Sequence, residues 1–126
     1  MKKLFISCPM KGRTDEAIKD SMKKMHKIAE IIFGEELEVI DGYVRKDTPD
    51  AVKHYPVWCL GKSIQKMAEA DYFIGINEYL YTGCNMERQI AHEYSIPMTL
   101  ISAYQLMSDI KPHLTGETCC AENAVG

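Results

Sequence analysis

The sequence predicts an α/β protein: one parallel sheet of four strands with helices on both faces. Short apolar segments alternate with amphipathic helical segments along the chain, and apolar strands that alternate with helices usually form a buried parallel sheet. Right-handed crossovers in such a sheet favour the strand order 2-1-3-4. A chain of 126 residues is the size of one domain, so we expect a single sheet.

The first half of the chain contains two predicted strands and a long predicted helix. Residues 3–7, KLFIS, form a short apolar run just before a proline. The helix that follows has Thr14 as its expected N-cap and Gly34 as its expected C-terminal stop. The second strand is LEVID, at residues 37–41. Spacings of three and four define the apolar face of the helix, which consists of Ile18, Met22, Met25, Ala29 and Ile32.

Residues 43–58 are predicted to form a long loop. The segment is polar and contains Pro49 and Pro56, and long loops inside compact domains are usually functional or mobile. We expect a lid or wall over a ligand site; the alternative is a surface excursion packed on the edge of the domain. The side chains able to stack on a base or to contact polar groups are Tyr43, Arg45, His54, Tyr55 and Trp58.

The second half continues the alternation. It is predicted to contain a helix at 57–70, a strand at 71–77, a helix that includes Glu87, a strand at 97–102 and a short helix at 103–110. Residues 112–126 have little apolar content and are expected to be a flexible tail. The predicted domain therefore covers residues 1–111.

Composition and charge exclude several classes of function. The formal net charge is −3 and the two signs are mixed along the chain, so no nucleic acid polymer is expected as a partner. No apolar run is long enough to cross a membrane. The 5 cysteines and 4 histidines show neither a disulfide framework nor the spacing of a metal site. We expect a cytoplasmic protein with reduced thiols and no metal.

Topology predicts where a ligand would bind. Parallel sheets bind ligands at the carboxyl ends of the strands, where the strand order reverses, and here strands one and three flank that point. The loops that follow them are residues 7–13, which carry Lys11 and Arg13, and residues 77–87, which begin with Asn77. Two cations near a helix N-terminus favour an anion such as phosphate, although a solvated turn is the alternative.

Glu87 is the residue of greatest interest in the second of these loops. At the opening turn of a helix, the dipole would lower its pKa and keep the carboxylate ionised. An ionised carboxylate in a cleft can attack an anomeric carbon and form a glycosyl ester, but a glutamate at this position can also simply cap the helix. Gly83 allows close backbone approach and Asn85 can hydrogen-bond a ligand, or both residues serve the turn.

Four segments together resemble the nucleoside 2-deoxyribosyltransferase superfamily. They are LFISCPMKGR, LEVIDGY, MAEADYFIGIN and TGCNMERQIAHEYSIP, so that the resemblance covers residues 3 to about 101. It is greatest to the small bacterial and phage members, which carry an ISGPMTG-like opening and a late Gly-Cys-x-x-Glu. The resemblance implies a Rossmann-like fold with the flavodoxin-like order 2-1-3-4, and cleavage or transfer at the N-glycosidic bond of a nucleoside or nucleotide without a cofactor.

The resemblance also implies roles for individual residues. The nucleophilic glutamate of the family falls on Glu87, and a family glycine falls on Gly83. Tyr81 and Ser63 stand where many members keep carboxylates that position the base or handle its proton, and Tyr81 or Asp41 could substitute for them. The residues expected to surround the sugar or phosphate are Cys8, Pro9, Met10, Lys11 and Gly12.

Two main hypotheses about function follow. The first is an N-glycosidase or deoxyribosyltransferase with Glu87 as nucleophile, acting on a nucleoside or its monophosphate. The second is a non-catalytic module that binds a nucleotide-like small molecule; a pure interaction protein is a third, weaker possibility. We also expect a homodimer or a larger homo-oligomer, because Met22, Met25, Met67 and Tyr94 enrich helix faces that one layer does not fully cover, unless these methionines belong to the core.

Overall fold

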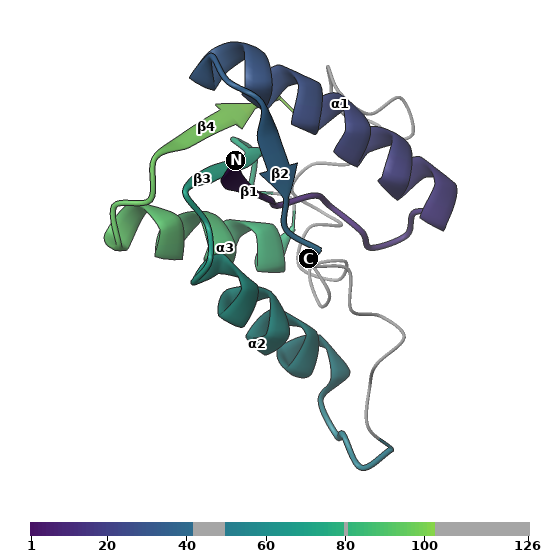
Figure 1. The fold of residues 1–126 in the computed structure, drawn as a ribbon. Coiled ribbons are helices and arrows are strands. Elements are labelled where there is room, and N and C mark those ends of the chain that lie inside the picture. Colours follow the sequence, from purple (N-terminus) through teal and green to yellow (C-terminus); the bar gives the residue numbers. More distant parts are fainter. Residues whose placement is uncertain (42–49, 80, 103–126) are drawn as a thin grey trace.

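The structure is a four-stranded parallel sheet with helices on both faces, which confirms the predicted fold class. The computed structural model describes residues 1–41, 50–79 and 81–102. The elements in these residues are β1 (Lys2–Ile6), α1 (Asp15–Phe33), β2 (Leu37–Val39), α2 (Tyr55–Met67), β3 (Tyr72–Ile76), α3 (Thr82–Glu93) and β4 (Met98–Ile101). All strand pairs are parallel and the order is β2-β1-β3-β4, as predicted (Figure 1).

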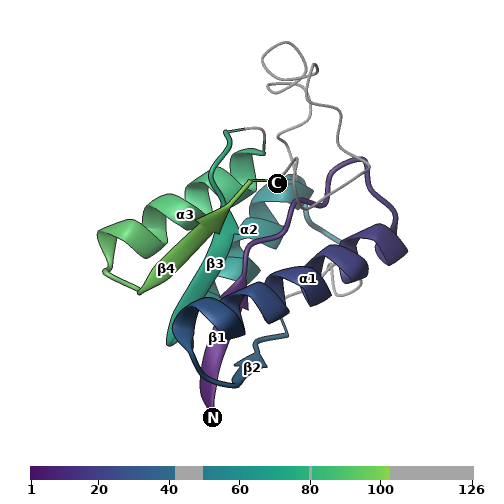
Figure 2. The same ribbon diagram turned by 90° about the horizontal axis from the view of Figure 1, so that it is seen from above.

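The sheet separates two hydrophobic clusters. Helix α1 covers one face, and α2 and α3 cover the other (Figures 1 and 2). Alternate residues of β1 point to opposite faces, so that Leu4 and Ile6 pack under α1 whereas Phe5 packs with α2 and α3. β3 divides in the same way, with Ile74 in the first cluster and Phe73 in the second. Burial on both faces explains why the strands are apolar without alternation.

β1 and β3 are the central strands, and they end side by side. Their register pairs Leu4 with Tyr72 and Ile6 with Ile74. The pairing extends one residue past β1, because the Ser7 N–H donates to the Ile74 carbonyl at 2.8 Å. The carboxyl end of β1 is therefore fixed against β3 at the point where topology predicts a ligand site.

Helix α1 has the two ends that the sequence predicts. The Thr14 hydroxyl accepts a hydrogen bond from the Ala17 N–H at 3.1 Å, and Gly34 adopts the left-handed conformation with φ of 74°. On its predicted apolar face, Ile18, Met25 and Ala29 are buried. Ile32 differs, because it lies in the last turn with 52% of its surface exposed.

Helix α2 begins earlier than predicted, at Tyr55 instead of residue 57. Pro56 lies in the first turn, where a proline costs no hydrogen bond and its fixed φ suits a helix. The Trp58 N–H already donates to the His54 carbonyl at 3.1 Å. The prediction of a loop over 43–58 is therefore wrong for residues 55–58, and residues 42–49 lie outside the described part of the chain.

The three methionines expected on exposed helix faces pack in or against the core. Met25 and Met67 are buried in the two core clusters and Met22 packs against the first, so these side chains belong to the core. Tyr94 is exposed. The homodimer or larger assembly stays a prediction. The predicted helix at 103–110, the end of the domain at residue 111 and the tail at 112–126 lie outside the described residues.

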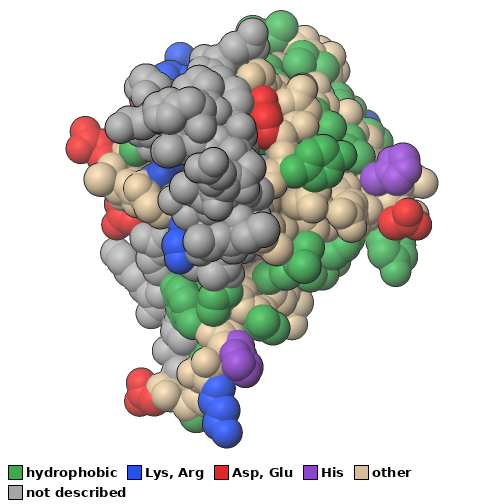
Figure 3. All heavy atoms as spheres, turned by 180° about the vertical axis from the view of Figure 1, so that it is seen from behind, with side chains coloured by type: hydrophobic (Ala, Val, Ile, Leu, Met, Phe, Trp, Pro, Cys, Tyr) green, Lys and Arg blue, Asp and Glu red, His purple; other side chains and the backbone are tan. Residues whose placement is uncertain are grey.

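The described surface carries charges of both signs. Acidic and basic side chains are scattered on the face shown in Figure 3, and hydrophobic side chains form separate small groups there. Among the helices described, none has the length and apolar character needed to span a bilayer. No cluster of three or more His, Cys, Asp and Glu side chains that could hold a metal ion occurs within residues 1–41, 50–79 and 81–102.

Candidate functional site

Three elements meet around the carboxyl group of Glu87. Ser7, directly after β1, donates its hydroxyl hydrogen to Glu87 Oε1 at 2.7 Å, and this contact is buried. Ser63, on α2, also makes a side-chain hydrogen bond to the carboxyl group. Residues separated by 80 positions in sequence are thus in direct contact at the predicted switch point of the sheet.

Glu87 does not lie where the sequence predicts. Helix α3 begins at Thr82, so that Glu87 is in its second turn and not in its opening turn. The N-cap residue is Tyr81, and no side chain caps this helix end. The interpretation of Glu87 as a helix cap is therefore wrong.

The protonation of Glu87 also differs from the expectation. Only 7% of the residue is exposed. Loss of hydration raises the pKa of Glu87 to about 7, although the hydrogen bonds from Ser7 and Ser63 oppose this shift. The predicted decrease is wrong because the carboxyl group is buried and lies beyond the first turn, where the helix dipole acts. Near neutral pH, Glu87 is consequently close to the midpoint of its titration.

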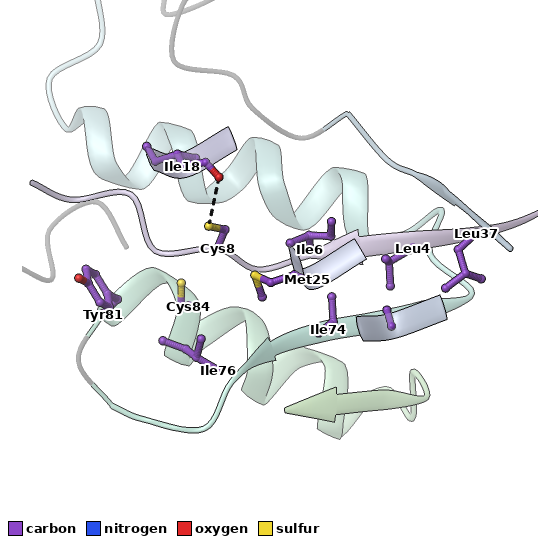
Figure 4. Close-up of a cluster of buried hydrophobic side chains, with 11 residues drawn as sticks. Leu4, Ile6, Cys8, Ile18, Met25, Leu37, Ile74, Ile76, Tyr81 and Cys84 are labelled. Atoms are coloured by element: carbon purple, nitrogen blue, oxygen red, sulfur yellow. Dashed lines mark hydrogen bonds between the residues drawn. The ribbon is translucent and has the colours of Figure 1, made fainter. Parts of the chain in front are cut away.

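One buried thiol, Cys84, lies close to this carboxyl group, and a second, Cys8, lies close to Cys84. Cys84, from the first turn of α3, and Cys8, from the loop after β1, belong to the same hydrophobic cluster as Tyr81 (Figure 4). Burial raises the pKa of the Cys84 thiol, and the nearby negative charge of Glu87 raises it further. Both effects keep Cys84 neutral, so the thiol can donate a hydrogen bond but is a poor nucleophile.

The loop after β1 is held from inside by Arg13. Its guanidinium donates to the Pro9 carbonyl at 2.9 Å and to the Ser21 hydroxyl at 2.6 Å, and also contacts the Cys8 sulfur at 3.7 Å. Arg13 is itself buried. The expectation that Arg13 offers its charge to an external anion is therefore wrong, because the guanidinium is directed into the fold.

The other predicted residues of this loop occupy different depths. Cys8 and Pro9 are buried, Met10 and Lys11 are half-buried, and Gly12 is exposed with φ of 74°. The turn closes with a hydrogen bond of 3.1 Å from the Arg13 N–H to the Met10 carbonyl. Of the two cations in residues 7–13, Lys11 is thus the one whose side chain is not buried.

The loop after β3 is held by Arg88. Its guanidinium donates to the Ile76 carbonyl at 2.9 Å and lies over the ring of Tyr79, 4.3 Å from the centroid. The same guanidinium donates to the side-chain oxygen of Asn85, so Asn85 bonds within the protein, to Arg88. Gly83 is buried in the first turn of α3.

Two predicted binding residues lie at the exposed rim of the strand ends. Asn77 follows β3 and Asp41 follows β2, and both are exposed. The Asn77 side chain lies 3.0 Å from the Glu78 carboxylate, with its amide nitrogen as donor. Glu78 in turn accepts a hydrogen bond from the Ser102 hydroxyl at 3.0 Å. Asn77 therefore joins a polar group after β3 and β4.

A separate open groove lies between α3 and β4, with a volume of about 410 Å³. Neither Glu87 nor its hydrogen-bonding partners Ser7 and Ser63 line this groove. The lining residues are Tyr79, Arg88, Gln89, His92, Glu93, Met98 and Leu100.

Sequence reasoning missed Ser7. The signal was available, because Ser7 is the first residue after a predicted central strand and a polar residue there faces the ligand site. Ser63 was found through the resemblance, and the structure brings it to Glu87. Tyr81 is buried beside Cys84 at the start of α3 (Figure 4). Comparison of the chain with protein-family models, with curated proteins and with solved structures gave no match.

Proposed function

We propose that the protein cleaves or transfers the N-glycosidic bond of a nucleoside or a nucleoside monophosphate, with Glu87 as the nucleophile. The observation that carries the proposal is the buried Glu87 carboxyl group at the carboxyl ends of the two central strands, held there by Ser7 at 2.7 Å. A buried carboxylate is poorly hydrated, which makes it more reactive toward an electrophilic carbon than the same group in water.

The chemistry proceeds in two steps. Ionised Glu87 attacks the anomeric carbon, the C–N bond breaks, and its electron pair leaves with the base. Water or a free acceptor base then attacks the same carbon, releases the Glu87 carboxylate and gives its proton to the base that departed in the first step. The nucleophile and an acceptor are sufficient for this route, so the proposal includes no cofactor.

Ser63 narrows the choice of substrate. A hydroxyl group can orient Glu87 by hydrogen bonding, but it is far too weak an acid to protonate a departing base. We therefore expect the fastest substrates to carry bases that leave readily, such as purines that are protonated or alkylated at N7. Tyr81 belongs to the same buried cluster as Cys84, and we expect its ring to shape the side of the site next to that thiol.

One observation favours a second candidate, a non-catalytic module that binds a nucleotide-like molecule. Because burial raises the pKa of Glu87 to about 7, a large share of this residue is neutral at physiological pH. A neutral carboxyl group can donate a hydrogen bond to a ligand and cannot act as a nucleophile. Binding without turnover would then be the function of the same residues.

A panel of substrates separates the two candidates. Deoxynucleosides, ribonucleosides and their monophosphates are incubated with the protein at pH 8, and released base is measured by chromatography. The enzyme hypothesis expects base release and, under rapid quench, a sugar adduct on the peptide that contains Glu87. Ligand binding by calorimetry without released base from any compound, N7-methylated purine nucleosides included, would support the binding module instead.

A further inference from the structure

Ser7 has the geometry of a residue that controls Glu87. Its backbone N–H is bonded to β3 through the Ile74 carbonyl at 2.8 Å, and only 1% of the residue is exposed. Its hydroxyl lies 2.7 Å from Glu87 Oε1, the usual length of a strong hydrogen bond to a carboxylate. Backbone and side chain thus connect the central strands directly to the candidate nucleophile.

We propose that Ser7 is a positioning residue, whose hydroxyl fixes the orientation of Glu87 and sustains the negative charge needed for attack. The inference rests on the proposed function, because it concerns how Glu87 is prepared for that reaction. An ionised carboxylate can only accept hydrogen bonds, so the Ser7 hydroxyl must donate to it. Donation to the charged form opposes the cost of burial.

Cys84 is a second neighbour of the Ser7 hydroxyl. Cys84 and Ser7 are hydrogen-bonding partners, and the thiol is kept neutral by burial and by the charge of Glu87. A hydroxyl has one hydrogen, and when that hydrogen goes to Glu87, Ser7 can only accept from the Cys84 S–H. With its hydrogen directed to Glu87, the Ser7 hydroxyl favours the ionised carboxylate.

Of the two hydroxyl groups that bond to Glu87, the hydroxyl of Ser7 is the buried one. Ser63, from α2, also bonds to Glu87 but is only half-buried. Besides Glu87, the titratable and charged groups near Cys84 are Cys8, from the loop after β1, and Arg88, from α3. Arg88 directs its guanidinium to the Ile76 carbonyl, and Cys8 is a thiol close to Arg13.

The test is a carboxyl titration of Glu87 by carbon NMR on glutamate-labelled protein. The Glu87 signal is identified by its absence in Glu87→Gln, and the midpoint in the wild type is expected at about 7. In Ser7→Ala, we expect the midpoint to rise by roughly one to two pH units, the equivalent of one lost hydrogen bond to a charged group. At pH 7 the ionised fraction would then fall roughly five- to fifty-fold.

Ser21→Ala is the matched control. Ser21 is also buried, and its hydroxyl bonds to a charged partner, the Arg13 guanidinium, at 2.6 Å. We expect it to lower stability without moving the titration of Glu87. If Ser7→Ala does not fold, Ser7→Cys keeps the shape with a weaker donor and should give an intermediate upward shift. An unchanged midpoint in the folded Ser7 variant, or an equal shift in Ser21→Ala, overturns the inference.

The titration does not depend on turnover. If the wild type releases base from no compound in the panel, the proposed function fails, while the midpoint in Ser7→Ala still decides whether Ser7 controls the charge of Glu87. If base is released, the pH profile of kcat/KM in Ser7→Ala should move upward together with the titration. Activity lost equally at every pH would overturn the claim that Ser7 sustains the negative charge of Glu87.

Discussion

Helices α1 and α3 both begin at the carboxyl edge of the sheet, but their first turns are built differently. The start of α1 has a side-chain cap from Thr14 and two acidic residues, Asp15 and Glu16, in its first turn. The start of α3 has neither a side-chain cap nor an acidic residue in its first turn. The first arrangement stabilises a helix start, whereas the second provides less local stabilisation.

Each helix start also has a buried ionisable side chain nearby, Arg13 at α1 and Glu87 at α3, and the two differ in their hydrogen-bond partners. Arg13 cannot lose its charge in a protein, and the fold surrounds its guanidinium with acceptors from Pro9, Ala17 and Ser21. The carboxyl group of Glu87 accepts hydrogen bonds from the hydroxyl groups of Ser7 and Ser63, and burial raises its pKa to about 7. A fully satisfied charge contributes to structure, whereas a carboxyl group close to its midpoint is suited to chemistry.

The largest expected effect comes from Glu87→Gln. This change keeps the shape of the side chain and removes the nucleophile, so base release should fall by several orders of magnitude. The matched control is Glu16→Gln, which removes one carboxylate from the exposed first turn of α1. A chromatographic assay should show a loss of base release in Glu87→Gln but not in Glu16→Gln. Turnover like that of the wild type in Glu87→Gln would end the nucleophile hypothesis.

The next effect is the dependence of rate on pH. Only ionised Glu87 can attack, and its pKa is raised to about 7, so kcat/KM should rise with pH and level off above about 8. At pH 5, the rate should be roughly a hundredth of the plateau. A profile that levels off already at pH 5 would show that Glu87 has the pKa of an ordinary exposed carboxylate. Repeating the pH profile with a substrate that carries a different base distinguishes ionisation of the substrate from ionisation of Glu87.

Stability should change with pH in the opposite direction. The pKa of Glu87 is raised from 4.5 to about 7 in the folded state, so between these values the folded protein holds a proton that the unfolded chain has lost. The free energy of unfolding therefore decreases as pH rises through this window, by roughly 3 kcal/mol from Glu87 alone. Urea denaturation of the wild type and Glu87→Gln isolates this contribution. The difference between the two proteins should be constant below pH 4 and above pH 8.

The sequence was most informative where local chemistry decides the structure. Thr14 and Gly34 were identified as the ends of α1 because caps act within one turn. The strand order followed from the alternation of elements. The start of α2 was predicted two residues late, because Pro56 indicates a loop as readily as it indicates the first turn of a helix.

The site was predicted less well because burial is a property of the whole fold. The direction of the Glu87 pKa shift depends on the surrounding sheet and helices, which no local pattern of sequence encodes. Ser7 and Glu87 are 80 residues apart, and only the pairing of β1 with β3 brings them together. In the same way, Arg13 resembled an exposed cation until its partners Pro9 and Ser21 were known.

The smallest expected effect tests the other side of the comparison, the start of α1. Thr14→Ala removes the hydroxyl that accepts from the Ala17 N–H at 3.1 Å, and it should lower the free energy of unfolding by about 1 kcal/mol. Thr14→Ser keeps a hydroxyl and should restore most of that loss in urea denaturation. Base release by both variants should equal that of the wild type, because Thr14 is exposed and serves only its helix. If Thr14→Ala slows base release while Thr14→Ser does not, the start of α1 is coupled to the site through the neighbouring Arg13, and the division between a structural and a chemical helix start fails.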